Sequence, residues 1–423
     1  MGTIKFALRM LKADFKKSLF YCGSLIFSTM IVFVFFNMTA NPVYGGDPSG
    51  KSQSFTTILS LIVVIIAMVM AFFANSFYLA NKSKELAIET LSGGSVLTLA
   101  NYILTQNFLI MLIAIPIGLV LGYLTIPLIN SYLYPRLNAT SPIWQIYPAG
   151  IGYTIVSLAT EMVWLVIVDT GYAYRTEIIS LIQAEKTMNP KSKGMIKLPD
   201  FIFVLLYVLP IILILTLEEE ATMYLAISCI GLFGISGILK AVMPKMLRRV
   251  VQSKYYNHPH KIISINNLNH SLKQATTLIQ MVIISATFLV CFMCVYFENP
   301  QQLVIILMSY AVLTFMMAVS ITYKVMIEAM QRKLSFRHLK MIGYVTKDLK
   351  KVIAQEVFGL YAVIIIFPLL YFMAILFKFV VASKITGIFG LGILLFYILI
   401  FVLAGFISYF IYQKIVLKGG QRS

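Results

Sequence analysis

Long apolar runs alternate with short polar segments along almost the whole chain. Each run holds about 20 residues, the number that an α-helix needs to cross the hydrocarbon layer of a bilayer. We interpret ten such runs as membrane spans: 18–39, 55–80, 104–131, 149–170, 199–217, 222–243, 276–296, 302–323, 357–380 and 388–413. The pattern therefore predicts an all-α, polytopic membrane protein with ten transmembrane helices.

Two of the polar segments, 82–107 and 326–356, repeat one pattern at a nearly constant distance. A step of 248 residues pairs Leu86 with Leu334, Ile88 with Phe336 and Leu91 with Leu339, and a step of 249 pairs Gly94 with Gly343 and Gln106 with Gln355. One slipped residue in an otherwise parallel pattern is typical of a diverged duplication. We therefore predict two four-span repeats, in which spans 1–4 match spans 7–10 and a two-span insert stands between them.

This duplication predicts how the chain is divided. The first half is 1–172 with a cytoplasmic coupling segment at 81–103, the linking spans 5 and 6 lie in 173–245, and the second half is 246–423 with a coupling segment at 324–356. If the N-terminus lies inside, all but four of the 34 Lys and Arg residues fall on the cytoplasmic side. Because basic residues gather in cytoplasmic loops, both termini are predicted to face the cytoplasm of a bacterial plasma membrane.

Composition agrees with this class and excludes several others. Hydrophobic residues make up 60% of the chain and charged residues only 12%, which excludes an ordinary soluble domain. The net charge of +18 is explained by the topology and by anionic lipid, so we expect no nucleic-acid partner. Cys291 and Cys294 lie in an apolar span, and His258 and His260 have no acidic or cysteine neighbour, so no metal site is predicted.

One stretch matches the phosphate-binding loop of ATPases by its letters alone. Residues 45–52 read GGDPSGKS, but they join two predicted spans on the outer face. A phosphate loop needs a strand before it and a helix N-terminus after it. Two weaker ATPase-like matches, at 91–95 and 165–169, also lie in or between spans. We therefore predict no ATPase activity, no catalytic residue and no cofactor in this chain.

The layout resembles the FtsX/MacB-like ABC transporter permeases of the type VII fold, in their ten-span, bacitracin- and antimicrobial-peptide-type branch. The resemblance rests on 84–94 and 332–343, where a basic residue, a leucine, further apolar positions and a glycine follow the second span of each repeat. Glu356 matches the glutamate that opens the next span in that family, whereas Asn107 departs from it. A further departure is the short link 298–302, where those relatives carry a large extracellular domain.

The resemblance implies a permease subunit driven by two copies of a cytoplasmic ABC ATPase, which would bind the ATP and magnesium. The residues that we predict to contact the ATPase are Lys84, Leu86, Ile88, Leu91 and Gly94 in the first copy and Ile327, Met330, Arg332, Lys333, Leu334, Phe336, Leu339, Ile342 and Gly343 in the second. Apolar and basic positions mixed on a helix suit a groove in a partner protein. The alternative is a helix that rests on lipid headgroups.

Acidic residues supply the candidates for substrate contact. Glu161 lies well inside an apolar span, where a carboxylate either faces a partner or a wet cavity or is a packed, protonated residue. Glu218, Glu219 and Glu220 crowd a short outer turn, which is either a cation-attracting site or a solvated turn.

Two function classes follow from the resemblance. The first is export of amphipathic peptides, including antimicrobial peptides, or of lipid-linked amphiphiles. The alternative is a mechanotransmission permease that regulates an external or membrane partner, such as a cell-wall hydrolase or sensor kinase, without moving a substrate. A small membrane protein is a further candidate partner, and the lipid bilayer is the surrounding medium in both cases.

Overall fold

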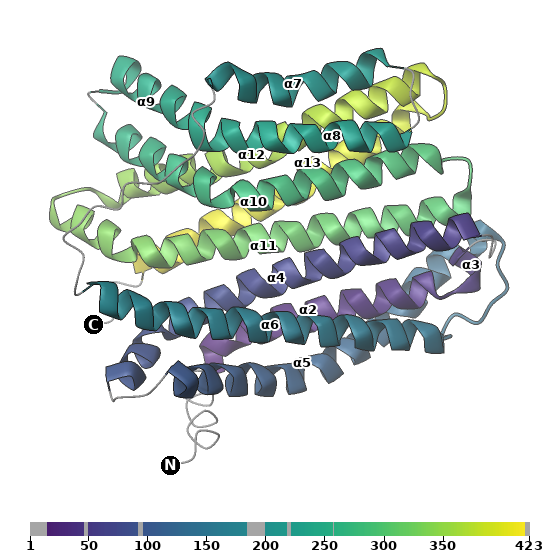
Figure 1. Ribbon diagram of the computed structural model, residues 1–423, viewed down its shortest axis with the longest axis horizontal. Helices are drawn as coiled ribbons and strands as arrows, with labels where there is room; N and C mark the ends of the chain where they lie inside the picture. Colours follow the sequence, from purple (N-terminus) through teal and green to yellow (C-terminus); the bar gives the residue numbers. More distant parts are fainter. Residues whose placement is uncertain are drawn as a thin grey trace. The chain divides into compact units, whose positions relative to one another are not determined.

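The computed structural model describes residues 15–45, 50–91, 96–183, 199–217, 221–256 and 258–418. Within these ranges every regular element is a helix and no strand occurs (Figure 1). The elements are α2 (Phe15–Thr39), α3 (Pro42–Gly45), α4 (Gly50–Leu91), α5 (Val96–Leu133), α6 (Pro148–Gln183), α7 (Asp200–Thr216), α8 (Ala221–Gly237), α9 (Met243–Lys254), α10 (Pro259–Val295), α11 (Pro300–Met341), α12 (Thr346–Val381) and α13 (Gly387–Gln413). The all-α prediction is confirmed for the described residues.

Nine helical segments in the described part of the chain are long and apolar enough to cross a membrane. The remaining predicted span, 199–217, forms α7, a helix of 17 residues that lies at the short end of the range for a transmembrane helix. The chain is thus a multi-pass membrane protein with nine candidate spans. The count of ten and the orientation of the termini stay predictions.

The chain forms two compact units, Met1–Ile196 and Lys197–Ser423. In unit 1, α2 packs against α4, α5 and α6. In unit 2, α10 packs against α8, α11 and α12, while α13 packs against α11 and α12. Helices α7 and α8, predicted as a separate insert, pack against each other and against α12 and α10 respectively. The linking spans therefore belong to the same compact unit as the helices of the predicted second half.

Helices α4 and α11 occupy corresponding places in the predicted repeat and share a length of 42 residues. Each runs without a break from an apolar span into the polar segment that follows it. The next helix in each unit, α5 or α12, contains an internal proline, Pro116 or Pro368. These likenesses agree with a duplication, which itself stays a prediction.

A glycine turn ends α11 and sends the chain back into α12. Gly343 has a φ of +104°, a backbone conformation that favours glycine because it has no Cβ. The Tyr344 N–H donates to the Leu339 carbonyl at 3.1 Å, and the Gly343 N–H donates to the Lys340 carbonyl at 3.1 Å. This pattern is a Schellman-type helix end. It turns the predicted second coupling segment into a helical hairpin.

Candidate functional site

The end of the α11–α12 hairpin exposes apolar side chains that a soluble surface normally hides. We call residues 326–356 the coupling hairpin. Leu334, Met341, Ile342 and Val345 have exposed fractions of 61%, 67%, 75% and 62%. The basic residues Lys333, Arg337, Lys347 and Lys350 are also exposed around this tip. An exposed apolar group with a basic rim is typical of a protein-interaction surface.

The structure separates the predicted coupling residues of the second copy into three groups. Lys333, Leu334, Ile342 and Gly343 are exposed, and Ile327, Met330 and Leu339 are half-buried. Phe336 is buried with an exposed fraction of 1%, and its ring packs against Tyr412 at a centroid distance of 6.2 Å. Arg332 also turns inward. The accessible surface is therefore the hairpin tip, which includes Met341 and Val345, two residues that the sequence pattern did not select.

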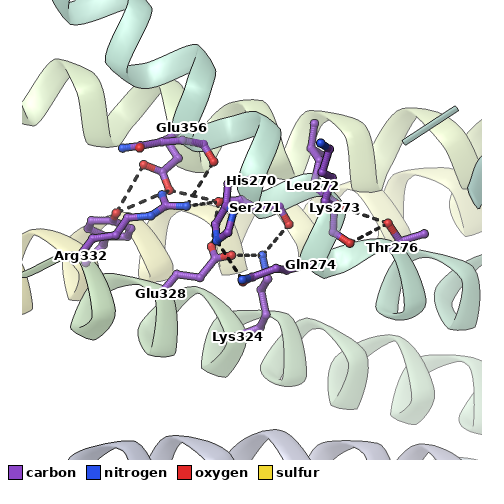
Figure 2. Close-up of polar contacts among 12 residues, drawn as sticks. His270, Ser271, Leu272, Lys273, Gln274, Thr276, Lys324, Glu328, Arg332 and Glu356 are labelled. Carbon is purple, nitrogen blue, oxygen red and sulfur yellow. Dashed lines mark hydrogen bonds and ion pairs between the residues drawn. The ribbon is translucent and has the colours of Figure 1, made fainter. Parts of the chain in front are cut away.

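A buried ionic cluster lies at the base of the coupling hairpin (Figure 2). Arg332 of α11 forms an ion pair with Glu356 of α12. Lys324 and Glu328, one turn apart on α11, form a second ion pair with a nitrogen–oxygen distance of 2.5 Å. The Ser271 hydroxyl of α10 lies between them and is 2.9 Å from Glu328 Oε2 and 3.2 Å from Glu356 Oε1. We call these five residues the unit 2 cluster.

Backbone and tyrosine contacts complete the hydrogen bonding of this cluster. Lys324 Nζ donates to the Ser271 carbonyl at 2.7 Å, and Arg332 Nη2 donates to the Asn267 carbonyl at 3.2 Å. The Tyr412 hydroxyl of α13 lies 3.4 Å from Glu356 Oε2. Charged groups in a low-dielectric interior are tolerated when they are paired and hydrogen-bonded in this way. The cluster thus joins α10, α11, α12 and α13 with two positive and two negative charges.

A cleft of about 250 Å³ opens beside the cluster. Polar and apolar residues of α10 and α11 line it: Ile263, Asn267, His270, Arg332, Ser335, Phe336 and Leu339. Leu339, predicted to contact a partner, therefore faces this cleft between α10 and α11.

The first predicted coupling segment is described only in part. Lys84, Leu86, Ile88 and Leu91 lie on the last turns of α4, where the structure describes the backbone but not the side chains. Gly94 falls outside the described residues. Glu218, Glu219 and Glu220 of the outer turn fall outside them as well.

Glu161 is buried within unit 1, with an exposed fraction of 2%. It lies near the middle of the candidate span Pro148–Tyr174 and faces α2, where the Ser28 hydroxyl donates to Glu161 Oε1 at 3.4 Å. Its role as a substrate contact stays a prediction. In the conformation described here its partner is a serine of the protein itself.

Asp169, two turns further along α6, is the centre of a second polar group that the sequence pattern did not identify. Asp169 is fully buried, and its two oxygens lie 2.5 Å from Asn75 Nδ2 of α4 and 2.5 Å from Asn107 Nδ2 of α5. Asn107 Nδ2 also lies 3.1 Å from Asn75 Oδ1. The sequence signal for this group is an aspartate inside an apolar span, at the end of the ATPase-like match 165–169. We call Asp169, Asn75 and Asn107 the unit 1 cluster.

The described residues contain no group of three or more His, Cys, Asp or Glu side chains that could hold a metal ion. The four cysteines are unbonded, and Cys291 and Cys294 are buried in α10. The polar chemistry of the described chain is therefore made of ion pairs, amides and buried carboxyl groups.

Comparison with known proteins connects this architecture to one class of membrane protein. No family model matches the chain. It is 31% identical over 176 residues to the uncharacterized ABC transporter permease YvcS of Bacillus subtilis (strain 168), a match that covers 41% of this chain and 27% of that protein. The chain is similar to ABC transporter permeases. A second relative is the bacitracin export permease protein BceB of Bacillus subtilis (strain 168), which is 21% identical over 218 residues.

The second match covers 51% of this chain and 33% of BceB. The matched part of this chain thus spans about a third or less of the length of the two curated relatives. Both relatives are named as permeases, and this is the type of subunit that the chain resembles.

Proposed function

We propose that this chain is the membrane permease subunit of an ABC transporter and that separate cytoplasmic ATPase subunits drive it. The permease names of both relatives and the nine candidate spans support this proposal. The observation that carries the mechanism is the coupling hairpin. Its tip presents exposed apolar residues inside a basic rim at the end of a helix that is continuous with a candidate span.

The hairpin tip is proposed to insert into a groove on one ATPase subunit. Leu334, Met341 and Ile342 would fill apolar pockets there, while Lys333 and Arg337 would pair with acidic residues on the rim. The unit 2 cluster lies below the tip and ties α11 to α12 through Arg332 and Glu356. A displacement of the tip would therefore carry both helices together. The end of α4 and its following segment would contact a second ATPase subunit in the same way.

The substrate class that we propose is an amphipathic peptide or a lipid-linked amphiphile that enters from the bilayer. One relative is named as a bacitracin export permease. The link between α10 and α11 spans only the few residues from Tyr296 to Asn299, too few to fold as a separate receptor domain on that side. ATPase stimulation of the reconstituted complex by cationic amphipathic peptides tests this class. Stimulation by small hydrophilic solutes alone would contradict it.

Co-purification with the ATPase tests the coupling hairpin. Ile342→Asp places a carboxylate on a side chain that is 75% exposed, so the fold of the chain should tolerate it. An unpaired carboxylate inside a protein interface costs several kcal/mol, on the order of a hot-spot residue. We therefore expect the tagged variant to lose the ATPase that the wild-type chain retains.

A matched control is available at the opposite end of α12. Ile388, at the start of α13, is 85% exposed, and Ile388→Asp makes the same chemical change far from the tip. This control should retain the ATPase. If Ile342→Asp also retains a fully stimulated ATPase, the hairpin is not the docking element.

A further inference from the structure

One face of α6 carries a line of buried polar residues through the interior of unit 1. Thr154, Ser157, Glu161 and Asp169 are all buried, with exposed fractions of 4% or less. Helix α2 packs against this face in the antiparallel direction, since Phe36 packs on Tyr153 at 6.0 Å and Ser28 donates to Glu161. The face is thus an internal polar strip within an apolar span.

The same register brings Tyr21 of α2 level with Asp169 of α6. Tyr21 lies seven residues before Ser28, and Asp169 lies eight residues after Glu161. At a rise of about 1.5 Å per residue, both lie roughly 10 to 12 Å from the Ser28–Glu161 contact and toward the same end of the unit. The Tyr21 hydroxyl is within electrostatic range of both Asp169 and Glu161. Two buried acids, about two helical turns apart on α6, and one buried phenol therefore lie in the same part of unit 1.

No cation of the protein balances these two acids in the described part of the chain. The ion pairs there are Lys245–Asp200, Lys324–Glu328, Arg332–Glu356 and Lys351–Asp348, and none involves Asp169 or Glu161. The nearest polar group toward the end of α4 is also engaged, because Lys82 Nζ donates to Gln106 Oε1 at 2.9 Å. An ionised carboxylate in a membrane interior without a counter-charge is costly. Among the described residues, these two acids therefore have no counter-charge, and protonation is the simplest way to neutralise them.

Two buried polar atoms beside Asp169 have no hydrogen-bond partner. They are the hydroxyl of Tyr21, whose side chain has an exposed fraction of 0%, and Oδ1 of Asn107. A buried unsatisfied acceptor costs about 1–3 kcal/mol, so such atoms point to a missing donor. An acid proton on Asp169 is such a donor. If the Asn107 amide turned about its last torsion, its oxygen would accept this proton, in place of the N–H that it now donates to Asp169 and at the loss of its 3.1 Å contact with Asn75.

We propose that unit 1 binds an exchangeable proton at Asp169, which Asn75 and Asn107 contact directly, with Glu161 as a second proton-binding group deeper in the span. The step is a simple protonation, in which the carboxylate gains a proton from water at the end of the unit that holds Lys82. Helices α2, α4 and α5 pack against α6 around this site, and the titratable groups at this level of the four helices are Tyr21 and Cys22 on α2, Tyr78 and Lys82 on α4, Tyr102 on α5 and Glu161 and Tyr172 on α6. Unit 1 therefore has a protonated and a deprotonated form, and the pH sets the proportion of the two.

Infrared spectroscopy of the full chain in lipid nanodiscs tests the proposal directly. At mildly acidic pH we expect a carbonyl band of a protonated carboxyl group that shifts when the aspartates carry ¹³C and that is absent from Asp169→Asn. Transfer to D₂O should shift the band, because the proposed proton exchanges. Glu356→Gln is the matched control in unit 2, and it should remove no such band because Glu356 is ion-paired.

Thermal unfolding supplies a second measurement that does not depend on band assignment. If the folded chain holds a proton that the unfolded chain releases, its Tm falls as the pH rises from mildly acidic to mildly alkaline values. Asp169→Asn should weaken this fall, and Asp169→Asn combined with Glu161→Gln should weaken it further. A wild-type spectrum with no protonated aspartate band, or a band that never shifts in D₂O, would overturn the proposal. A Tm that rises with the Na⁺ concentration at constant pH but does not change with pH would also overturn it. The neutralising cation would then be Na⁺.

Discussion

The two units place polar groups at corresponding positions and stabilise them in different ways. The 249-residue step pairs Asn107 with Glu356, and each belongs to a buried cluster. In unit 2 this position holds a carboxylate, and the cluster supplies its own cations from Lys324 and Arg332. In unit 1 the same position holds an amide, and the carboxylate of the cluster is Asp169 on α6. The unit 2 cluster is balanced by its own charges, whereas the unit 1 cluster depends on the proposed proton.

This difference suits a division of work between the units. Paired charges resist separation in a low-dielectric interior, so the unit 2 cluster keeps α11 and α12 together below the coupling hairpin. Neutral amides around a single acid exchange hydrogen-bond partners at lower cost. Unit 2 is therefore the stiffer element at its coupling end, and unit 1 is the one whose interior can change its protonation.

The largest effect is expected from removing one member of the unit 2 cluster. Arg332→Met leaves Glu356 buried without its cation, and breaking a buried pair in this way costs about 3–5 kcal/mol. The measurement is the free energy of unfolding in lipid nanodiscs. Lys333→Met, one residue away and exposed, should change it by less than about 0.5 kcal/mol.

A double variant sharpens this prediction. Arg332→Met with Glu356→Met removes both charges and should be more stable than Arg332→Met alone, since no uncompensated carboxylate remains. Additive losses in the two single variants and the double variant would show that the two residues do not act as a pair.

An intermediate effect comes from the same acid-to-amide change made in each unit. Glu356→Gln removes the negative charge that balances Arg332 and should destabilise the chain by about 2–4 kcal/mol. Asp169→Asn mimics the proposed protonated acid and should change stability by less than about 1 kcal/mol at neutral pH. Equal losses in the two variants would remove the contrast between the units.

At the hairpin turn we expect a loss smaller than that of Glu356→Gln. Gly343→Ala meets no atom within 4 Å of the new Cβ, so its cost comes only from the φ of +104° and should be about 1–2 kcal/mol. Limited proteolysis of the hairpin should report faster cleavage, with little change in the unfolding of the spans. Gly387→Ala, at another open glycine with no positive φ, is the control and should leave both unchanged.

The sequence was sufficient for the class of the fold because apolar length is a local property. Nine of the ten predicted runs lie in helices that meet the requirements of a span, and the polar segment after the eighth run does form the end of a long helix. The sequence did not predict which way individual side chains point. Arg332 and Phe336 were assigned to a partner surface, because nothing near them in the sequence shows that α12 and α13 return to cover them.

The unit 1 cluster was missed for a related reason. Asn75, Asn107 and Asp169 come from three different helices, and 94 residues separate the two ends of the Asn75–Asp169 hydrogen bond. No spacing rule connects residues at such distances. Asn107 was noted only as a departure from a family pattern, and its structural meaning became visible once Asp169 lay beside it.

The straightness of α11 has a mechanical consequence. Its 42 residues contain no internal proline and give a length of roughly 60 Å, whereas its neighbour α12 loses a backbone hydrogen bond at Pro368. A force applied at the tip is thus transmitted along α11 as along a rigid helix, while α12 can bend at Pro368. Joined at their base and unequal in stiffness, the two helices would convert a push along their axis into a sideways bend at the far end of unit 2.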